Sequence, residues 1–322
     1  MQSETAEARS TATVATPEHH IWRGYFLIVA ATFCWGAAAT AGKAVFSGQL
    51  FSGAASISPL VLTQARTTFS VLVLIVILLV RFGPRFFRIS ARDFVLSMLV
   101  GTLGLASSNY FYYLAIQKST VAIAITLQYT APIWVLLAMI FSGREAPSAR
   151  RFVSVVLAIL GCALTIDLFH SGRTLSTAGV AAAMVASFAF AFYNIVAQML
   201  VTRNHQFKVM VYALLGAAIL WAVVNPPWRL VSQPYTGAQW GFLFLFACLS
   251  MLVPYFFYFS GLKYLDPTGA VIASCLEPVF AIMFAAIFVH ERLRALQAAG
   301  VLAVLAASIM VQMQRRRMAM PE

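Results

Sequence analysis

The chain has 322 residues, of which 61% are apolar and only 10% are charged. A soluble domain carries roughly 25% charged residues, so this composition excludes a water-soluble globular protein and predicts an all-α protein of the lipid bilayer. The formal net charge is +12, but the basic residues lie in short gaps between long apolar runs and do not form the polar basic patch that a nucleic-acid partner needs.

Ten apolar segments are each long enough for a transmembrane helix, which needs about 20 mostly apolar residues. Before them, residues 1–22 are polar and typical of a disordered tail, and after them residues 314–322 form a basic tail. Continuous apolar runs of this length favour helices over the strands of a closed barrel. The predicted spans are residues 24–46, 58–80, 94–115, 120–141, 149–168, 177–201, 208–225, 238–260, 267–289 and 295–313.

The distribution of Lys and Arg predicts that both termini face the cytoplasm. Cytoplasmic loops of membrane proteins carry an excess of these residues. With the N-terminus inside, fifteen Lys and Arg fall in inner segments and five in outer segments, while Lys43 and Arg66 fall within predicted spans. We therefore expect a multi-pass protein of the cytoplasmic membrane.

An internal repeat divides the chain into two five-helix halves, residues 23–168 and 177–313. The first span aligns with the sixth at a shift of 155 residues. Because five is odd, the two halves cross the membrane in opposite senses, and such inverted repeats are typical of secondary transporters with a solute site near the midplane. Duplication without transport, as in some channels, is the alternative. The pairs that match at a shift of 146 are Tyr112 and Tyr258, Ala115 and Gly261, Pro132 and Pro278, and Glu145 and Glu291.

Short motifs recur in an order and spacing that are more specific than any one of them. They are Trp35-Gly36 followed by Lys43, then Leu276-Glu277-Pro278-Val279 running on to His290-Glu291-Arg292-Leu293, and a weaker first-half copy from Ala131-Pro132 to Arg144-Glu145. Over residues 24–313 the chain thereby resembles the EamA family of the drug/metabolite transporter superfamily. The resemblance implies ten helices in two inverted five-helix repeats, and export or exchange of metabolites such as amino acids.

The resemblance also places individual residues. It puts Trp35 and Lys43 on the family's first-helix pattern and Glu277-Pro278 on its ninth-helix pattern. One departure stands out, because the first half has Ala131 where the second half has Glu277. Any function of this carboxylate therefore belongs to the second half alone and has no counterpart in the first half.

Glu277 is the sharpest candidate for a substrate-binding or coupling residue. It lies about ten residues into the ninth span, hence roughly 15 Å deep. A charged group at that depth costs about 2.5–3.5 kcal/mol on insertion scales and marks function by default. A carboxyl group there can carry a proton. The alternative is a structural pair, or a Glu-Pro step that only packs.

Lys43 and Arg66 are the cationic candidates. Lys43 lies near the outer end of the first span. It is a candidate for contact with the solute or with a gate, and the alternative is that its side chain only extends to the membrane–water interface. Arg66 lies eight residues into the second span, too deep for that extension, and a guanidinium can bind a carboxylate with two hydrogen bonds. A fixed bond to backbone carbonyls or to Glu277 is the alternative.

Further polar and aromatic residues at mid-depth are candidates to line a solute path, although aromatic residues also serve as packing and interface anchors. Prolines remove a backbone hydrogen bond and can kink or gate a helix. Acidic residues that end a helix among arginines are candidates for structural ion pairs or gating. The lining candidates are Trp35, Asn109, Tyr110, Gln128, Tyr129, Tyr193, Asn194 and Tyr255; the kink and gating candidates are Pro132, Pro254, Pro278, Glu145 and Glu291.

No motif indicates an enzyme, a metal or a cofactor. The histidines lie outside the spans or at their edges, the four cysteines have no CxxC spacing, and neither a GxSxG elbow nor a phosphate-cradling loop is present. Without a phosphate-cradling loop, ATP does not drive transport directly, so we expect transport to be facilitated or coupled to an ion gradient. A channel would need a ring of like groups or a repeated filter, which fits the asymmetric polar residues less well than alternating access does.

We therefore expect a secondary transporter, not an enzyme, with the lipid bilayer and a small organic solute as its partners. The opposite charges of Glu277 and of Arg66 or Lys43, together with the aromatic residues, favour a zwitterionic or amphipathic metabolite such as an amino acid. A channel-like facilitator is the second interpretation. The sequence does not choose between a monomer and a homo-oligomer.

Overall fold

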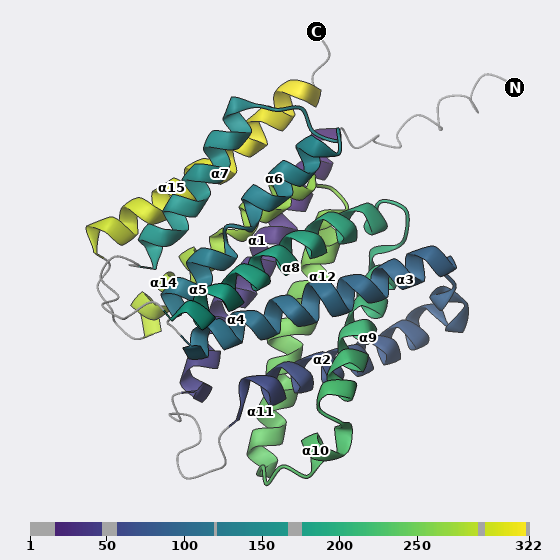
Figure 1. Ribbon diagram of the computed structural model, residues 1–322. Helices are drawn as coiled ribbons and strands as arrows, with labels where there is room; N and C mark the ends of the chain where they lie inside the picture. The colour runs from purple at the N-terminus through teal and green to yellow at the C-terminus, as the bar shows by residue number, and fades with distance from the viewer. Residues whose placement is uncertain (1–16, 47–56, 119–120, 167–175, 289–293, 320–322) are drawn as a thin grey trace, which may run out of the picture.

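The computed structural model describes residues 17–46, 57–118, 121–166, 176–288 and 294–319. In these ranges all regular structure is helical, with no strand among them (Figure 1). Eight stretches of the described chain are long and apolar enough to cross a membrane, and they match eight of the ten predicted spans. These stretches are Ile21–Ala38, Leu60–Phe82, Ala91–Lys118, Ala124–Phe141, Thr177–Val201, Gln206–Val224, Gly237–Leu262 and Pro267–Phe284.

The two other predicted spans coincide with helical stretches that are shorter than 18 residues or only partly apolar. Residues 149–168 contain α7 (Ala149–Thr165), which has 17 residues. Residues 295–313 contain the apolar stretch Ala295–Met310 of α15 (Ala295–Ala319). A helix of about 17 residues is at the lower limit for crossing a hydrocarbon core of roughly 30 Å. α7 and α15 pack along each other at one edge of the molecule (Figure 1).

Several of the eight stretches are built from more than one helical segment. In chain order, the remaining elements are α1 (Pro17–Phe46), α2 (Pro59–Phe82), η2 (Pro84–Phe87), α3 (Ala91–Leu99), η3 (Val100–Ala106), α4 (Ser107–Lys118), α5 (Val121–Gln128), α6 (Ala131–Phe141), α8 (Thr177–Val201), α9 (Gln206–Val224), α10 (Pro227–Val231), α11 (Gly237–Ala247), η5 (Cys248–Leu252), α12 (Val253–Leu262), α13 (Pro267–Ser274) and α14 (Leu276–Phe288).

The helices extend further than predicted at both ends of the chain. α1 begins at Pro17, so residues 17–22, which the sequence assigned to a disordered tail, are helical. Proline is favourable in the first turn of a helix, because the N–H that it lacks has no partner within the helix there. α15 runs on to Ala319, so residues 314–319, which the sequence assigned to a basic tail, continue the helix.

Two spans contain a π-helical segment at matching positions. η3 lies between α3 and α4, and η5 lies between α11 and α12. Shifted by 146 residues, η5 falls on residues 102–106, inside η3. A Cβ at Gly101 would lie 1.9 Å from the carbonyl oxygen of Ala213, so glycine is needed there for η3 to approach α9. Single π-helical turns leave a backbone carbonyl poorly bonded and are frequent at functional sites.

Two other spans are broken at matching positions. α5 and α6 are separated by the turn Tyr129–Thr130, and α13 and α14 are separated at Cys275. Position 275 also falls on position 129 at the shift of 146. Each predicted proline lies in the first turn of the segment that follows an interruption, where its missing N–H is harmless. The three are Pro132 in α6, Pro254 in α12 and Pro278 in α14.

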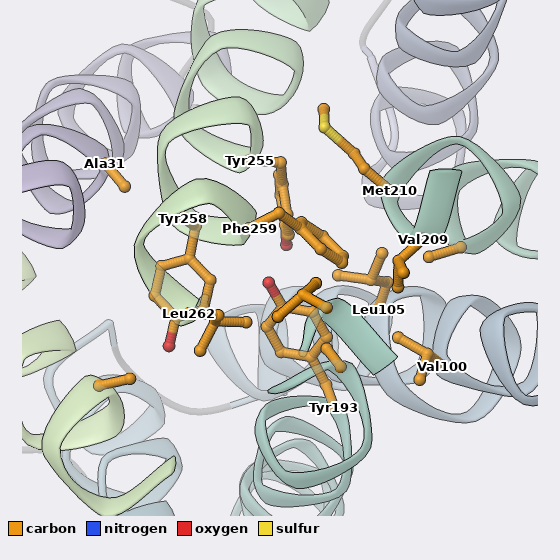
Figure 2. Close-up of a cluster of buried hydrophobic side chains, with 14 of the residues drawn as sticks. Ala31, Val100, Leu105, Tyr193, Val209, Met210, Tyr255, Tyr258, Phe259 and Leu262 are labelled. Atoms are coloured by element: carbon orange, nitrogen blue, oxygen red, sulfur yellow. The ribbon is translucent and has the colours of Figure 1, made fainter. Parts of the chain in front are cut away.

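The largest buried cluster joins both halves of the chain. Tyr193 of α8 meets Tyr258 and Phe259 of α12 at ring-centroid distances of 5.7 Å each. Figure 2 shows these rings between η3, α9 and α1, with Leu105 and Met210 beside them. α1 packs on α12 and α14, and α4 packs on α8. First-half helices are thereby fixed against second-half helices, which places the two broken spans close to one another.

Candidate functional site

Glu277 lies in the first turn of α14, directly after the break at Cys275. Its Oε2 atom accepts a hydrogen bond of 2.7 Å from the hydroxyl of Tyr129. Tyr129 is buried at the break between α5 and α6. The two predicted candidates therefore join the two broken spans through one bond, although they lie 148 residues apart in the chain.

The Trp35-Gly36 motif of α1 lies against this site. A Cβ at Gly36 would lie 2.8 Å from the Cβ of Phe280 and 2.9 Å from the amide nitrogen of Ala281. The missing side chain therefore lets α1 approach α14 one turn beyond Glu277. The Trp35 ring packs on the ring of Tyr255, with 5.3 Å between the centroids. The two residues of the motif therefore make different contacts. Gly36 allows α1 to pack closely on α14, and Trp35 packs on the aromatic ring of Tyr255.

Arg66 of α2 is buried, with 5% of its surface exposed. Its Nη1 donates to the hydroxyl of Tyr113 (2.5 Å), and its Nη2 donates to the carbonyl oxygen of Ser250 (2.9 Å). Ser250 lies in η5, so the guanidinium takes a carbonyl of the π-helical segment. The third donor nitrogen, Nε, is buried without a hydrogen-bond partner. The guanidinium also lies over the rings of Tyr113 and Phe246.

Arg66 and Glu277 are neighbours but not an ion pair. The charge of Arg66 acts on Glu277 and on the hydroxyl of Tyr255. Within the described part of the chain the one salt bridge joins Arg151 to Glu145, so Arg66 and Glu277 are more than 4.0 Å apart. A buried cation and a half-buried carboxyl group are therefore held near each other without direct contact.

Asn109 and Tyr255 complete what we call the central site: Trp35, Arg66, Asn109, Tyr129, Tyr255 and Glu277. The side-chain amide of Asn109 donates to the carbonyl of Leu105 (2.7 Å) and to the Tyr255 hydroxyl (3.2 Å). These two residues are 146 positions apart, which is the shift of the repeat. Residues at equivalent positions of the two halves therefore touch at the central site.

Four other lining candidates lie elsewhere or are fully packed. Gln128 donates to Ser108 (3.2 Å) and is half-buried. Tyr110 packs on Trp221 with 5.6 Å between the ring centroids. Asn194 is fully buried and accepts a hydrogen bond from Tyr258 (2.5 Å). Tyr193 belongs to the aromatic cluster of Figure 2. Tyr193 and Asn194 pack between α8 and α12, and the Tyr193 ring also contacts the ring of Tyr255, with 6.2 Å between the centroids.

Two cationic or gating candidates cannot be placed in the site. Lys43 lies in α1, but its side chain is outside the described part of the structure. Glu291 lies outside the described residues altogether. Its first-half counterpart Glu145 follows α6 and pairs with Arg151 at 2.5 Å, as predicted for a structural ion pair. Burial and the nearby carboxyl group of Asp266 together raise the pKa of Glu145 to about 7, although Arg151 opposes this rise.

Sequence analysis missed two partners of Arg66. Tyr113 follows Tyr112 in a run of aromatic residues and is no more polar than its neighbours. The carbonyl of Ser250 is a backbone group that becomes available through the π-helical turn, which has no simple sequence signature. The sequence does contain one local signal near this carbonyl. Ser250 is a single polar residue in an apolar run, four positions before Pro254.

Comparison with known proteins identifies the family. The sequence profile of the EamA-like transporter family matches residues 22–167 and again residues 177–313. The chain belongs to this family. It is therefore a multi-pass membrane transporter that handles a small-molecule solute, and it is not an enzyme. The two separate matches correspond to the two halves that the internal repeat predicts.

Similar proteins include the threonine/homoserine exporter RhtA of two bacteria. The protein from Salmonella typhimurium (strain SL1344) is 29% identical over 259 residues, covering 80% of this chain and 84% of the relative. The protein from Escherichia coli (strain K12) is 28% identical over the same coverage. A crystal structure of a further protein, 17% identical, superposes over 92% of this chain and 98% of that chain with a TM-score of 0.73, which shows a shared fold.

Proposed function

We propose that this EamA-like transporter exports a small zwitterionic amino acid by alternating access, in exchange for protons. One observation carries the proposal. In the central site, buried Arg66 and half-buried Glu277 lie near each other without forming an ion pair. An α-amino acid carries a carboxylate and an ammonium group a few ångströms apart and matches this arrangement.

Arg66 would bind the solute carboxylate. Its guanidinium has no carboxylate partner among the described residues, and its Nε is buried without a hydrogen bond. A planar guanidinium binds carboxylates with paired hydrogen bonds. The bond from Nη2 to the Ser250 carbonyl holds the group in place and leaves the charge itself unneutralised.

Glu277 would bind the ammonium group and the coupling proton in turn. Its carboxylate accepts one hydrogen bond from Tyr129 and remains partly exposed. A carboxylate at mid-membrane is expensive when unpaired, so it is stabilised by either a solute ammonium group or a proton. Exchange of the two on opposite sides of the membrane moves one proton inward for each amino acid outward. The zwitterion is neutral, so each cycle moves one positive charge inward.

The aromatic groups would enclose the remainder of the solute. Trp35 and Tyr255 pack edge to face at 5.3 Å, and Asn109 bonds the Tyr255 hydroxyl. Sites of this kind combine apolar walls with a few fixed polar groups. The choice of an amino acid also draws on the relatives, which are threonine/homoserine exporters.

Alternating access draws its support from the repeat. The broken spans α5–α6 and α13–α14 meet at Tyr129 and Glu277. Secondary transporters built from inverted repeats hold their solute at such interrupted helices near the midplane. Rocking of one half against the other about this point would open the central site to either side. We place both termini in the cytoplasm, following the distribution of Lys and Arg.

The decisive test is transport in proteoliposomes that contain the full-length protein. Counterflow of labelled threonine and homoserine into vesicles loaded with unlabelled amino acid measures exchange, and an internal pH dye measures coupled proton movement. We expect saturable counterflow in the wild type and proton movement that depends on the amino acid. Glu277→Gln should lose proton movement by at least tenfold, because an amide binds no proton.

The control is Asp93→Asn, which removes an acidic residue that bonds Asn204 away from the central site. It should transport like the wild type. Counterflow is also challenged with an amino alcohol and a hydroxy acid, which each lack one of the two charged groups. If both compete as well as the amino acid does, the zwitterion proposal is wrong. Flux that neither saturates nor shows counterflow would instead indicate a channel-like facilitator.

A further inference from the structure

Two carboxyl groups meet where the halves of the chain touch, away from the central site. Glu145 follows α6 in the first half, and Asp266 precedes α13 in the second. Arg144, Arg150 and Lys263 lie within five residues of them in the sequence. The distribution of Lys and Arg assigns this face of the protein to the cytoplasm. We call it the inner face.

One oxygen of each carboxyl group accepts hydrogen bonds that fix its position. Oε2 of Glu145 accepts from Nη1 of Arg151 at 2.5 Å and from the hydroxyl of Thr268 at 2.9 Å. Oδ2 of Asp266 accepts from the amide of Gly269 at 3.1 Å and so caps α13. The other two oxygens, Oε1 of Glu145 and Oδ1 of Asp266, are both buried. Thr268, which bonds Glu145, lies two residues after Asp266 at the start of α13, so the two carboxyl groups belong to one cluster, and the carboxyl group of Asp266 acts on Glu145.

We infer that Glu145 and Asp266 share one proton, which holds the two halves together at the inner face. Two carboxylates at this separation repel each other, so one of them is stable when protonated. A pair that holds one proton has a charge of −1, which the guanidinium of Arg151 neutralises. Loss of the proton leaves two buried carboxylates against a single guanidinium, and that excess charge favours separation of the loop from the start of α13.

The surroundings agree with a proton that titrates near neutrality. Burial and the carboxyl group of Asp266 raise the pKa of Glu145 to about 7, while Arg151 and the hydrogen bond from Thr268 oppose that rise. From α7 the charged group that faces Glu145 is Arg151, and from the segment before α13 it is Asp266.

The proton site has a consequence for transport, and this consequence rests on the proposed function. Access from the cytoplasm requires that α13 move away from the loop after α6. An alkaline cytoplasm removes the shared proton and favours the inward-open state, and an acidic cytoplasm favours the closed state. The proton site would then act separately from Glu277, which exchanges its proton with the solute.

The test measures opening of the inner face without any solute or gradient. Cys275 lies at the break that ends α13 and is fully buried, so it reacts with N-ethylmaleimide when α13 moves. Its rate of alkylation in the full-length protein in detergent is followed by mass spectrometry from pH 6 to pH 8. Each wild-type rate is divided by the rate of Glu145→Gln at the same pH, which cancels the ionisation of the thiol itself. The partly exposed Cys34 and Cys248 are internal references.

We expect the wild-type ratio to rise at least threefold across this range. In Glu145→Gln the amide donates to Asp266 at every pH, so the contact stays closed. Asp266→Asn makes the same bond from the other side and should match Glu145→Gln, which guards against a folding defect in one variant. Asp93→Asn should follow the wild type. A flat wild-type ratio, or a rise that persists in Asp266→Asn, would overturn the shared proton.

The outcome is independent of the transport test. A flat ratio together with proton-coupled counterflow would remove the inner-face proton site and keep the proposed function. A rising ratio in a protein that moves no amino acid would keep the proton site and remove the proposed solute.

Discussion

Arg66 shows how a single buried charge can be held in place without being neutralised. It is fixed by the hydroxyl of Tyr113, by the carbonyl of Ser250 and by two aromatic faces, and none of these carries a negative charge. Buried arginines are usually paired, since an unpaired charge in the membrane interior is costly. The arrangement therefore suits a residue whose anionic partner is the solute.

Replacing Arg66 by lysine tests this role. Lysine keeps the positive charge but has one donor atom on a flexible stem, so it cannot bond Tyr113, Ser250 and a carboxylate in one fixed geometry. We expect the KM for amino-acid counterflow to rise about tenfold, which corresponds to about 1.4 kcal/mol. Arg229→Lys, at an exposed position of α10, is the matched control. An unchanged KM would leave Arg66 with a purely structural bond to the carbonyl.

At the same scale, depth in a span can be counted from the sequence, so Arg66 and Glu277 stand out as charges within apolar runs. The structure brings both together with Tyr129 and Tyr255, while their role in solute binding stays a prediction. Asn194 was also at mid-depth, yet it is fully buried and bonded to Tyr258. A span that is apolar on all sides gives no sequence signal for which of its faces packs against a neighbouring helix. The surroundings of a residue such as Asn194 are therefore not predictable from its depth alone.

At the scale of the elements, the spans were predictable and their interruptions were not. Length and apolarity mark a span, and eight predicted spans were found within the described residues. Pro132 and Pro278 indicated breaks, but a proline can also lie in an unbroken span. The π-helical segments η3 and η5 leave no comparable mark. Recognising them depends on backbone geometry, although their common shift of 146 residues follows from the repeat.

The contact between α7 and α15 yields a prediction about elements. A Cβ at Gly300 would lie 2.4 Å from the amide nitrogen of Thr165 and 2.7 Å from the carbonyl oxygen of Gly161. Small residues let membrane helices pack closely, so Gly300→Leu must force the two helices apart. We expect a loss of at least about 1–3 kcal/mol, the usual cost of overpacking.

The measurement is the thermal unfolding temperature of the full-length protein in detergent, which should fall by several degrees in Gly300→Leu. Gly241→Leu is the matched control, because Gly241 lies within α11 and a Cβ there meets nothing within 4 Å. An equal drop in both variants would mean that loss of glycine itself is responsible. No drop in Gly300→Leu would mean that α7 and α15 are not held together in this way.

At the scale of the whole molecule, the two halves are joined by contacts that differ in their response to pH. The aromatic cluster of α8 and α12 carries no charge, whereas Glu145 and Asp266 join the halves through ionisable groups. His205, at the start of α9, responds in the opposite direction. Burial lowers its pKa, and the nearby Lys263 and Lys208 lower it further. Stability therefore depends on pH through two groups of opposite sign.

The sign for each group follows from linkage between protonation and folding. The pKa of Glu145 is about 7 in the folded protein, above its ordinary value of 4.5, so its contribution is fully present below pH 4.5 and is lost as pH rises through 7. The pKa of His205 lies below its ordinary value of 6.5, so its contribution is present above pH 6.5 and is lost as pH falls. Between pH 6.5 and 8 the Glu145 effect should dominate.

We therefore expect the Tm of the wild type in detergent to fall from pH 6.5 to pH 8, and the Tm of Glu145→Gln to fall less. Subtracting the two curves removes the contribution of His205 and every other group the variants share. The Tm of the wild type minus the Tm of Glu145→Gln should be largest at pH 6.5 and should become smaller as the pH rises past 7. A difference that stays constant over this range would show that Glu145 is ionised throughout, held by Arg151 alone. The halves would then be joined at the inner face by an ordinary ion pair that no proton controls.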